Sequence, residues 1–152
     1  MADEEIDRLA NLGAKYLAER NPDMAIEYFL GAREIAQTEE RADLAAHLLV
    51  LVARAWSLKG SASKALYASR RAVRERPDDT LCLSAFGHLS ERAADDAQRK
   101  GKLRRATVLL DAAAWAWSRS AAIGCDETSM SISNQVNEKV HRLREFVRAR
   151  GG

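Results

Sequence analysis

Apolar and polar positions along the chain follow a helical pattern. Apolar residues recur at spacings of three and four, as at Leu9, Leu12 and Tyr16, and no stretch shows the alternation that predicts a strand. Helix-favouring alanine, leucine, arginine and glutamate are abundant, and the two prolines are Pro22 and Pro77. The pattern predicts an all-α protein with seven helices joined by short turns: residues 3–19, 22–37, 39–59, 62–75, 79–100, 103–122 and about 129–149.

Residues that cap helices mark several of these boundaries. Asn21 followed by Pro22 is typical of an N-cap and a first helical turn. Thr38 before two glutamates predicts another helix start, because acidic side chains are stabilised in a first turn. Glycines interrupt the later helical stretches at Gly60, Gly101 and Gly124.

The packing positions of the first two predicted helices return later in the chain. Gly13 and Ala25 are small enough for close helix approach, and Tyr16 and Phe29 are large enough to fill the space beside them. A shift of 40 residues gives Leu49, Val52, Ala53, Trp56, Gly60, Ala65, Ser69, Ala72 and Pro77, and a further shift of 34 gives Leu83, Phe86, Gly87 and Ser90. A period of this length indicates stacked helix pairs.

These positions resemble the tetratricopeptide repeat family, whose signature places Leu-Gly, Tyr, Ala, Phe, Ala and Pro across two helices. The first unit has Gln37 in place of the closing proline. The second unit keeps that proline as Pro77, with Trp56 for the tyrosine and Ser69 for the phenylalanine. The third unit fits only with seven residues inserted before Gly101, about two helical turns, which would lengthen its first helix without turning the core stripe outward.

The resemblance implies one domain over residues 1–152, built as a right-handed superhelical stack of antiparallel helix pairs. Repeats are expected at about 6–38, 46–78 and 80–123, followed by a capping helix at about 129–149. An apolar stripe suits a cap with one face on the last repeat, and it consists of Val136, Val140, Leu143 and Val147.

In this family the concave surface is lined by the first helix of each pair, and it binds peptides or helices of partner proteins. The resemblance therefore implies a non-enzymatic adaptor or scaffold with a partner-binding groove. Carried over position by position, the groove residues are Asp7, Asn11, Ala14, His47, Val50, Leu51, Arg54, Leu58, Leu81, Ser84, His88, Glu91 and Arg92.

One subclass of the family differs from this sequence at its ligand-binding positions. Its co-chaperones clamp a C-terminal carboxylate with Lys, Asn and Arg side chains, whereas the matching positions here are Ala10, Ala14, Val50, Leu81 and Ala85. None of these side chains can bind a carboxylate, so no carboxylate-clamp chaperone peptide is expected. A suitable ligand is an amphipathic helix or an apolar extended peptide.

Two tryptophans on the sixth predicted helix point to different sides, because residues two apart diverge by about 200°. Trp117 continues the row of Ala106, Leu110 and Ala113 and is expected in the core. Trp115 must lie either under the capping helix or toward a partner, and burial under the cap is the favoured expectation.

No catalytic, metal or cofactor site is predicted. Ser61 to Lys64 spells SxxK, but it opens a helix directly after Gly60 and has no companion motif of serine acylating enzymes. Asp95 and Asp96 are adjacent on a helix and diverge by about 100°, which argues against a paired acid and base. His47, His88 and His141 lie on three predicted helices without metal-ligand spacing.

The net charge of +2 hides an asymmetry along the chain. Residues 1–43 contain 5 basic and 11 acidic side chains, and the remainder contains 19 basic and 11 acidic ones. Such a distribution can drive head-to-tail contact, so a self-associating assembly module or homo-oligomer stays open. With an acidic N-terminus and no long apolar run, a soluble, cytoplasmic protein without membrane contact is expected.

The densest basic segment supports a second alternative, which is nucleic-acid or polyanion binding together with the basic last helix. Interleaved aromatic residues for base stacking are missing, so this reading ranks below the adaptor. The candidate anion contacts are Arg99, Lys100, Lys102, Arg104 and Arg105.

Overall fold

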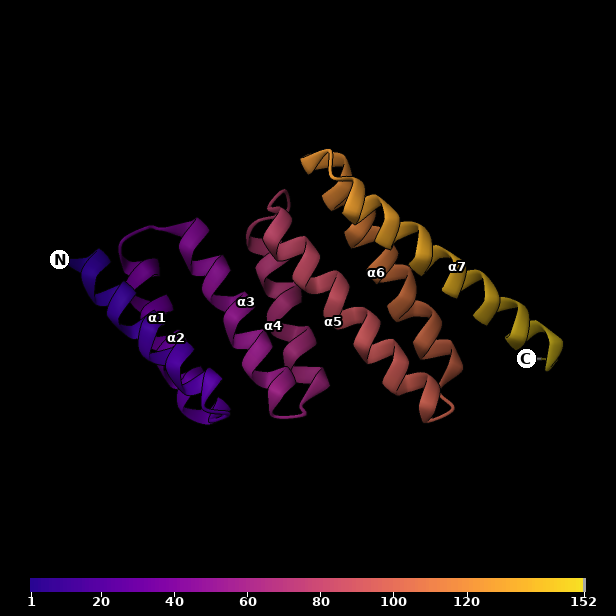
Figure 1. The fold of residues 1–152 in the computed structure, drawn as a ribbon, viewed down its shortest axis with the longest axis horizontal. Coiled ribbons are helices and arrows are strands. Elements are labelled where there is room, and N and C mark those ends of the chain that lie inside the picture. Colours follow the sequence, from indigo (N-terminus) through magenta and orange to yellow (C-terminus); the bar gives the residue numbers. More distant parts are fainter. Residues whose placement is uncertain (152) are drawn as a thin grey trace. The chain divides into compact units, whose positions relative to one another are not determined.

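The computed structural model describes residues 1–151, and these form helices and turns without a strand (Figure 1). The all-α class and the seven helices are therefore confirmed. Their bounds are α1 Ala2–Ala18, α2 Pro22–Thr38, α3 Ala42–Leu58, α4 Ala62–Glu75, α5 Thr80–Arg99, α6 Leu103–Gly124 and α7 Glu127–Ala149.

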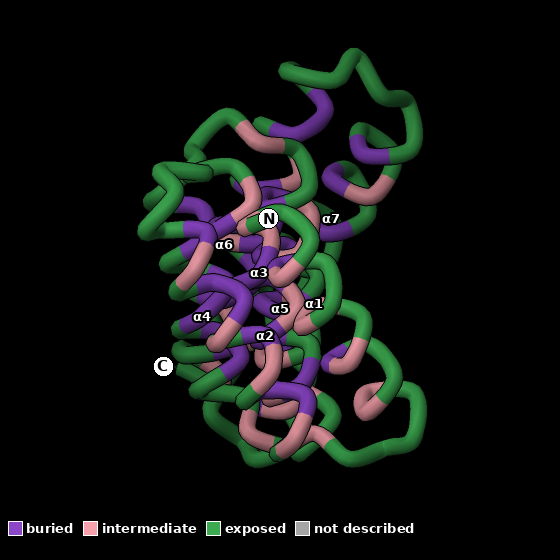
Figure 2. Tube along the Cα trace, turned by 90° about the vertical axis from the view of Figure 1, so that its left-hand side faces the viewer, coloured by how far each residue is buried: buried purple, intermediate pink, exposed green. Residues whose placement is uncertain are grey.

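The chain divides into two compact units, Met1–Pro77 and Asp78–Gly152. In the first unit, α1 packs against α2, α2 against α3, and α3 against α4; in the second, α5 packs against α6 and α6 against α7. Buried and exposed stretches alternate along the helices, because each turns one face toward its neighbours (Figure 2). The expectation of a single domain remains a prediction.

One type of turn recurs between the helices. Arg20, Glu40, Gly60 and Gly101 each take a positive φ, between 55° and 89°. The next residue then donates its backbone N–H to a carbonyl five residues back, at 2.8–2.9 Å, in the pairs Asn21–Tyr16, Arg41–Ala36, Ser61–Trp56 and Lys102–Ala97. This Schellman-type ending satisfies carbonyls at the helix C-terminus and reverses the chain in two or three residues.

The predicted helix start at Thr38 is wrong. The hydroxyl of Thr38 donates to the carbonyl of Glu34 at 3.0 Å inside α2, and Arg41 is the N-cap of α3. Glu40 in the left-handed conformation sets this turn, although glutamate gives no sequence signal for it.

The helices of the first unit follow a regular period. α1 and α3 begin at Ala2 and Ala42, and α2 and α4 begin at Pro22 and Ala62. A helix pair therefore repeats every 40 residues, which is longer than the tetratricopeptide period of about 34. The longer period reflects helices of 17 residues in α1, α2 and α3.

Each unit contains a glycine in close contact with an aromatic ring on the next helix. A Cβ atom placed on Gly13 of α1 would lie 2.6 Å from the ring of Phe29 on α2, which is fully buried. A Cβ atom on Gly87 of α5 would lie 2.7 Å from Nε1 of Trp117 on α6. Both glycines are required for the helix approach, as the sequence pattern indicates.

A buried arginine connects three helices of the first unit. Arg33 on α2 is 3% exposed. Its Nη1 donates to the carbonyl of Ala45 on α3 at 2.8 Å, and its Nη2 donates to the carboxylate of Glu75 on α4 at 2.8 Å. A guanidinium can be buried in this way because both of its ends are hydrogen bonded.

We expect replacement of Arg33 to destabilise the protein. Arg33→Met leaves the carbonyl of Ala45 and the partly exposed carboxylate of Glu75 without this donor, so the free energy of unfolding in urea falls by about 1–3 kcal/mol. The matched control is Arg41→Met, which removes an exposed pair with Asp3 at 2.8 Å and costs at most about 1 kcal/mol. Equal losses in the two variants would contradict the role of Arg33.

Two glycines provide a second test of helix packing. Gly13→Ala places a methyl group against the ring of Phe29 and should lower the free energy of unfolding by about 1–3 kcal/mol. Gly31→Ala is the control, because its Cβ would meet only Leu9, at an ordinary 3.7 Å. It should be neutral or stabilising by up to about 1 kcal/mol, since alanine favours helices. Urea unfolding of both variants measures the difference, and similar effects would argue against the close contact.

Candidate functional site

One face of α5 carries four of the residues predicted to bind a partner. Leu81, Ser84, His88 and Glu91 follow one another at spacings of three and four, which places them in a row on the helix. Leu81 is 40% exposed, His88 is exposed, and Ser84 and Glu91 are partly exposed.

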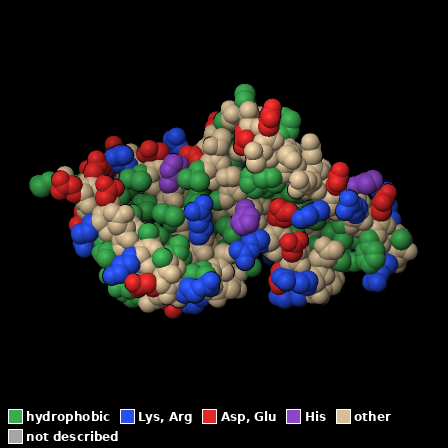
Figure 3. Space-filling model, in the orientation of Figure 1, with side chains coloured by type: hydrophobic (Ala, Val, Ile, Leu, Met, Phe, Trp, Pro, Cys, Tyr) green, Lys and Arg blue, Asp and Glu red, His purple; other side chains and the backbone are tan. Residues whose placement is uncertain are grey.

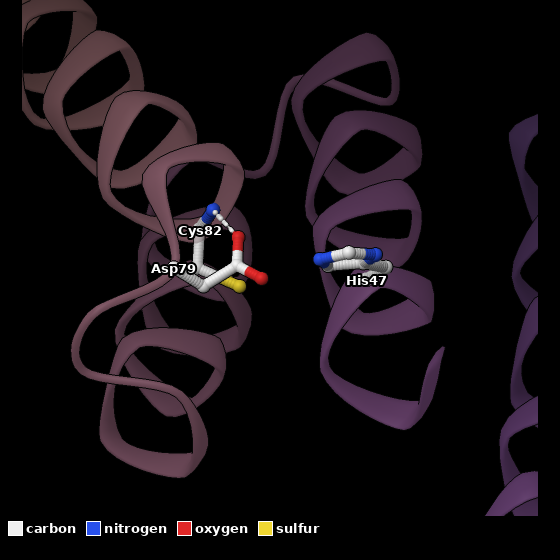
Figure 4. Close-up of side chains that lie close together, drawn as sticks. All are labelled: His47, Asp79 and Cys82. Carbon is white, nitrogen blue, oxygen red and sulfur yellow. Dashed lines mark hydrogen bonds between the residues drawn. The ribbon is translucent and has the colours of Figure 1, made fainter. Parts of the chain in front are cut away.

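The start of this row is fixed by a helix cap. Asp79 Oδ1 accepts hydrogen bonds from the backbone N–H groups of Leu81 at 2.9 Å and Cys82 at 3.1 Å; Figure 4 shows the second of these. The cap orients the first turn of α5 and so presents Leu81 at the helix surface.

The same row continues into a cleft within the second unit. Asp95 and Gln98, the next positions at spacings of four and three, form part of its wall. The cleft has a volume of about 420 Å³ and is lined by Asp95, Gln98, Leu110, Lys139, Arg142, Leu143 and Phe146, from α5, α6 and α7.

The base of the cleft is apolar and its rim is charged. Leu110 and Leu143 are 2% and 5% exposed, whereas Phe146 is 46% exposed. The guanidinium of Arg150 lies 4.6 Å from the Phe146 ring. Figure 3 shows acidic, basic and apolar side chains next to one another toward the C-terminal end of this unit. Such a surface suits an apolar side chain flanked by polar or charged groups.

Two ion pairs hold α7 in position. Nζ of Lys139 lies 2.5 Å from Oε1 of Glu91 on α5, and Nη2 of Arg144 lies 2.6 Å from Oδ2 of Asp111 on α6. The hydrogen bond with Glu91 raises the pKa of Lys139, with further favourable charge from Asp95. Glu91, predicted to contact a partner, thus links two helices beside the cleft.

The N-terminal end of α7 is fixed by Asp126. Its carboxylate accepts hydrogen bonds from the hydroxyl of Ser129 at 2.7 Å and the backbone N–H of Thr128 at 2.9 Å. These two bonds, the Ser129 hydroxyl first, hold the pKa of Asp126 below its usual range. Ser133 on α7 also donates to the carbonyl of Ala114 on α6, at 3.5 Å.

In the first unit, α1 and α3 each present part of the predicted groove. Arg41, at the start of α3, bonds to Asp3 at the start of α1 at 2.8 Å, so the two helices begin side by side. Asp7, Asn11 and Ala14 are exposed on α1; Arg54 and Leu58 are exposed on α3, while His47 and Leu51 are partly exposed. Figure 4 shows His47 on α3.

Val50 and Arg92 differ in their surroundings from the other predicted groove residues. Val50 is 1% exposed and belongs to the core, so it cannot contact a partner as the prediction required. Arg92 is exposed on α5 but is not without an interaction partner.

The basic segment between α5 and α6 is only partly available to an anion. Nζ of Lys100 lies 3.0 Å from Asp96, and Arg99 approaches the same carboxylate at 3.8 Å. The bond with Lys100 lowers the pKa of Asp96. The three remaining cations are exposed and form no ion pair within residues 1–151: Lys102, Arg104 and Arg105.

The two tryptophans of α6 differ as the helical spacing predicts. Trp117 packs against Gly87 and is only partly exposed. Trp115 is 50% exposed, so the favoured expectation that it is buried under α7 is wrong.

No protein-family model matches the sequence, and the search of curated proteins finds no match either. Within residues 1–151, every helix is too short or too polar to cross a membrane.

None of the seven residues that line the cleft is among the predicted binding residues. The predicted row on α5 ends near Glu91, before Asp95 and Gln98. The last helix was expected only to cap the stack, although Lys139, Arg142 and Phe146 line the cleft. Two features of the sequence could have predicted these positions. The spacing of three and four continues along α5 beyond Glu91, and Phe146 lies outside the apolar stripe of the last helix.

We expect the Glu91–Lys139 pair to stabilise the second unit modestly. A double-mutant cycle with Glu91→Gln and Lys139→Met should give a coupling of about 0.2–1 kcal/mol at neutral pH, because both groups are partly exposed. Since the folded pKa of Lys139 is raised, the coupling is complete below the ordinary pKa of lysine. It disappears as pH rises through the raised value.

The control for this cycle is the exposed pair Glu138–Arg142, whose charged atoms are 3.5 Å apart. The corresponding cycle with Glu138→Gln and Arg142→Met should give a smaller coupling, of at most about 0.3–0.5 kcal/mol. If urea unfolding shows equal coupling for the two pairs, Glu91–Lys139 does not hold α7 in the way described.

Proposed function

We propose that this protein is a non-enzymatic adaptor or scaffold of the tetratricopeptide-like kind, which binds a segment of a partner protein. The observation that carries the proposal is the cleft beside α5. It offers a buried apolar base, one exposed aromatic ring and charges of both signs on its rim. Clefts of this composition receive an apolar anchor from a peptide or helix.

The rim defines the chemistry of the preferred segment. Arg142 favours an acidic side chain and Asp95 favours a basic one, so an apolar anchor with opposite charges on its two sides fits best. The row of Leu81, Ser84 and His88, of which Ser84 is partly and the other two are well exposed, extends this contact along α5. A segment of three or four helical turns, or a comparable extended peptide, can follow the row into the cleft.

Polyanion binding remains the second candidate, on the observation that Lys102, Arg104 and Arg105 form no ion pair within residues 1–151. Three cations support only weak, salt-dependent contact with phosphates. Arg104→Gln together with Arg105→Gln would remove such contact and leave the cleft unchanged.

A peptide-display selection on the whole protein, followed by titration of the selected peptide, tests the adaptor proposal. Phe146→Glu should weaken binding by at least about tenfold, because it places a charge where the apolar anchor lies. Trp115→Glu is the matched control, as Trp115 is similarly exposed, in the same unit and outside the cleft. It should bind as the original protein does.

A selected peptide that binds Phe146→Glu unchanged would overturn the cleft as the binding site. Loss of binding in Trp115→Glu alone would move the site to the outer surface of α6. Circular dichroism of both variants verifies that the helices are retained.

A further inference from the structure

The outward face of α4 is basic along its whole length. Lys64, Tyr67, Arg71 and Arg74 follow one another at spacings of three, four and three, which aligns them on one side of the helix. All four are exposed, and Tyr67 is 66% exposed in the middle of the row. This face, called here the α4 basic face, has no part in the cleft of the second unit.

The positive charge of the α4 basic face is not neutralised by its own helix. Glu75 is the one acidic residue of α4, and Arg33 holds it at 2.8 Å. Arg71 and Arg74 form no ion pair within residues 1–151. Nζ of Lys64 lies 4.4 Å from the ring of Trp56, an uncharged partner.

The exposed face of α1 is complementary in charge and spacing. Glu4, Asp7, Asn11 and Ala14 also follow one another at three, four and three, and all are exposed. Glu4 and Asp7 form no ion pair within residues 1–151, whereas the neighbouring Asp3 and Glu5 are bonded to Arg41 and Arg8. The α1 acidic face therefore presents two unpaired carboxylates at its start.

We propose that the α1 acidic face of one molecule docks antiparallel on the α4 basic face of a second molecule. In this register, Glu4 meets Arg74 and Asp7 meets Arg71. The short side chains of Asn11 and Ala14 then lie opposite Tyr67 and Lys64, where they leave room for the tyrosine ring. A parallel register would match only Glu4 with Lys64, so the antiparallel one is favoured.

Such a contact joins different surfaces of two identical chains. α1 packs against α2 and α4 against α3 within the unit, so each molecule retains one acidic and one basic face for neighbours. A heterologous contact of this kind extends head to tail unless the rotation closes a ring. Because the charges are exposed, the association is weak and sensitive to salt.

Sedimentation of the full chain at rising concentration tests the contact. At about 20 mM salt, the mean mass should rise above the 16.8 kDa of one chain, and at about 500 mM it should return to that value. Arg71→Glu with Arg74→Glu should abolish the rise, and so should Glu4→Arg with Asp7→Arg.

Mixing the two charge-reversed variants gives the sharpest result. The first variant keeps its acidic face and the second keeps its basic face, so the equimolar mixture should associate although neither variant does so alone. If circular dichroism shows that charge reversal disturbs folding, neutral variants replace the charge-reversed ones. These are Arg71→Gln with Arg74→Gln, and Glu4→Gln with Asp7→Asn. Each neutral pair should weaken association at least about tenfold.

Charge reversals elsewhere are the controls. The association should be unchanged by two double variants: Arg104→Glu with Arg105→Glu on α6, and Glu27→Arg with Glu34→Arg on α2. The proposal is overturned if the original chain stays monomeric at low salt, or if the mixed variants fail to associate. It is also overturned if the α4 basic face proves instead to bind an oligonucleotide, with loss on Arg71→Glu and Arg74→Glu and no self-association.

This inference does not depend on the adaptor proposal. A peptide selected for the cleft should bind the Arg71→Glu and Arg74→Glu variant as it binds the original protein. Absence of self-association would therefore not contradict the proposal that the cleft binds a peptide. Absence of peptide binding would not contradict the proposed contact between α1 and α4 of two molecules.

Discussion

A glycine against an aromatic ring is the constraint on which each unit depends. Gly13 admits the ring of Phe29, and Gly87 admits the indole of Trp117, so that α1 and α5 can lie close to the helices that follow them. Any side chain at either glycine would force the two helices apart, and the buried residues beside them would lose contacts. In the first unit, Arg33 adds α3 and α4 to this pair through the carbonyl of Ala45 and the carboxylate of Glu75.

In the second unit, the same packing leaves a cleft, which is the proposed binding site. α5 has 20 residues and α7 has 23, compared with 14 in α4, so both helices extend along α6. Two ion pairs connect α7 to its neighbours, Glu91–Lys139 and Asp111–Arg144. The cleft lies between the longer helices, with Leu110 and Leu143 at its base.

Helical spacing predicted the class of the fold and most helix bounds, because burial of one face requires a regular apolar row. The start of α3 was missed because Glu40 adopts a conformation that sequence associates with glycine or asparagine. Arg33 and Glu75 were missed because a charged residue in a helix is usually exposed, and their pairing spans 42 positions. The cleft depends on how α7 crosses its neighbours, which spacing along one helix does not specify. Val50 on α3 and Trp115 on α6 were misplaced because spacing alone does not say which faces of a helix its neighbours cover.

The central claim is that a partner segment inserts an apolar side chain between α5 and α7. Nuclear Overhauser contacts between a selected peptide and the methyl groups of the protein test it most directly. The account predicts contacts from the peptide's apolar anchor to the methyl groups of Leu110 and Leu143, at the base of the cleft. Contacts to Val108 on the outer surface of α6, with none to Leu110 or Leu143, would contradict it.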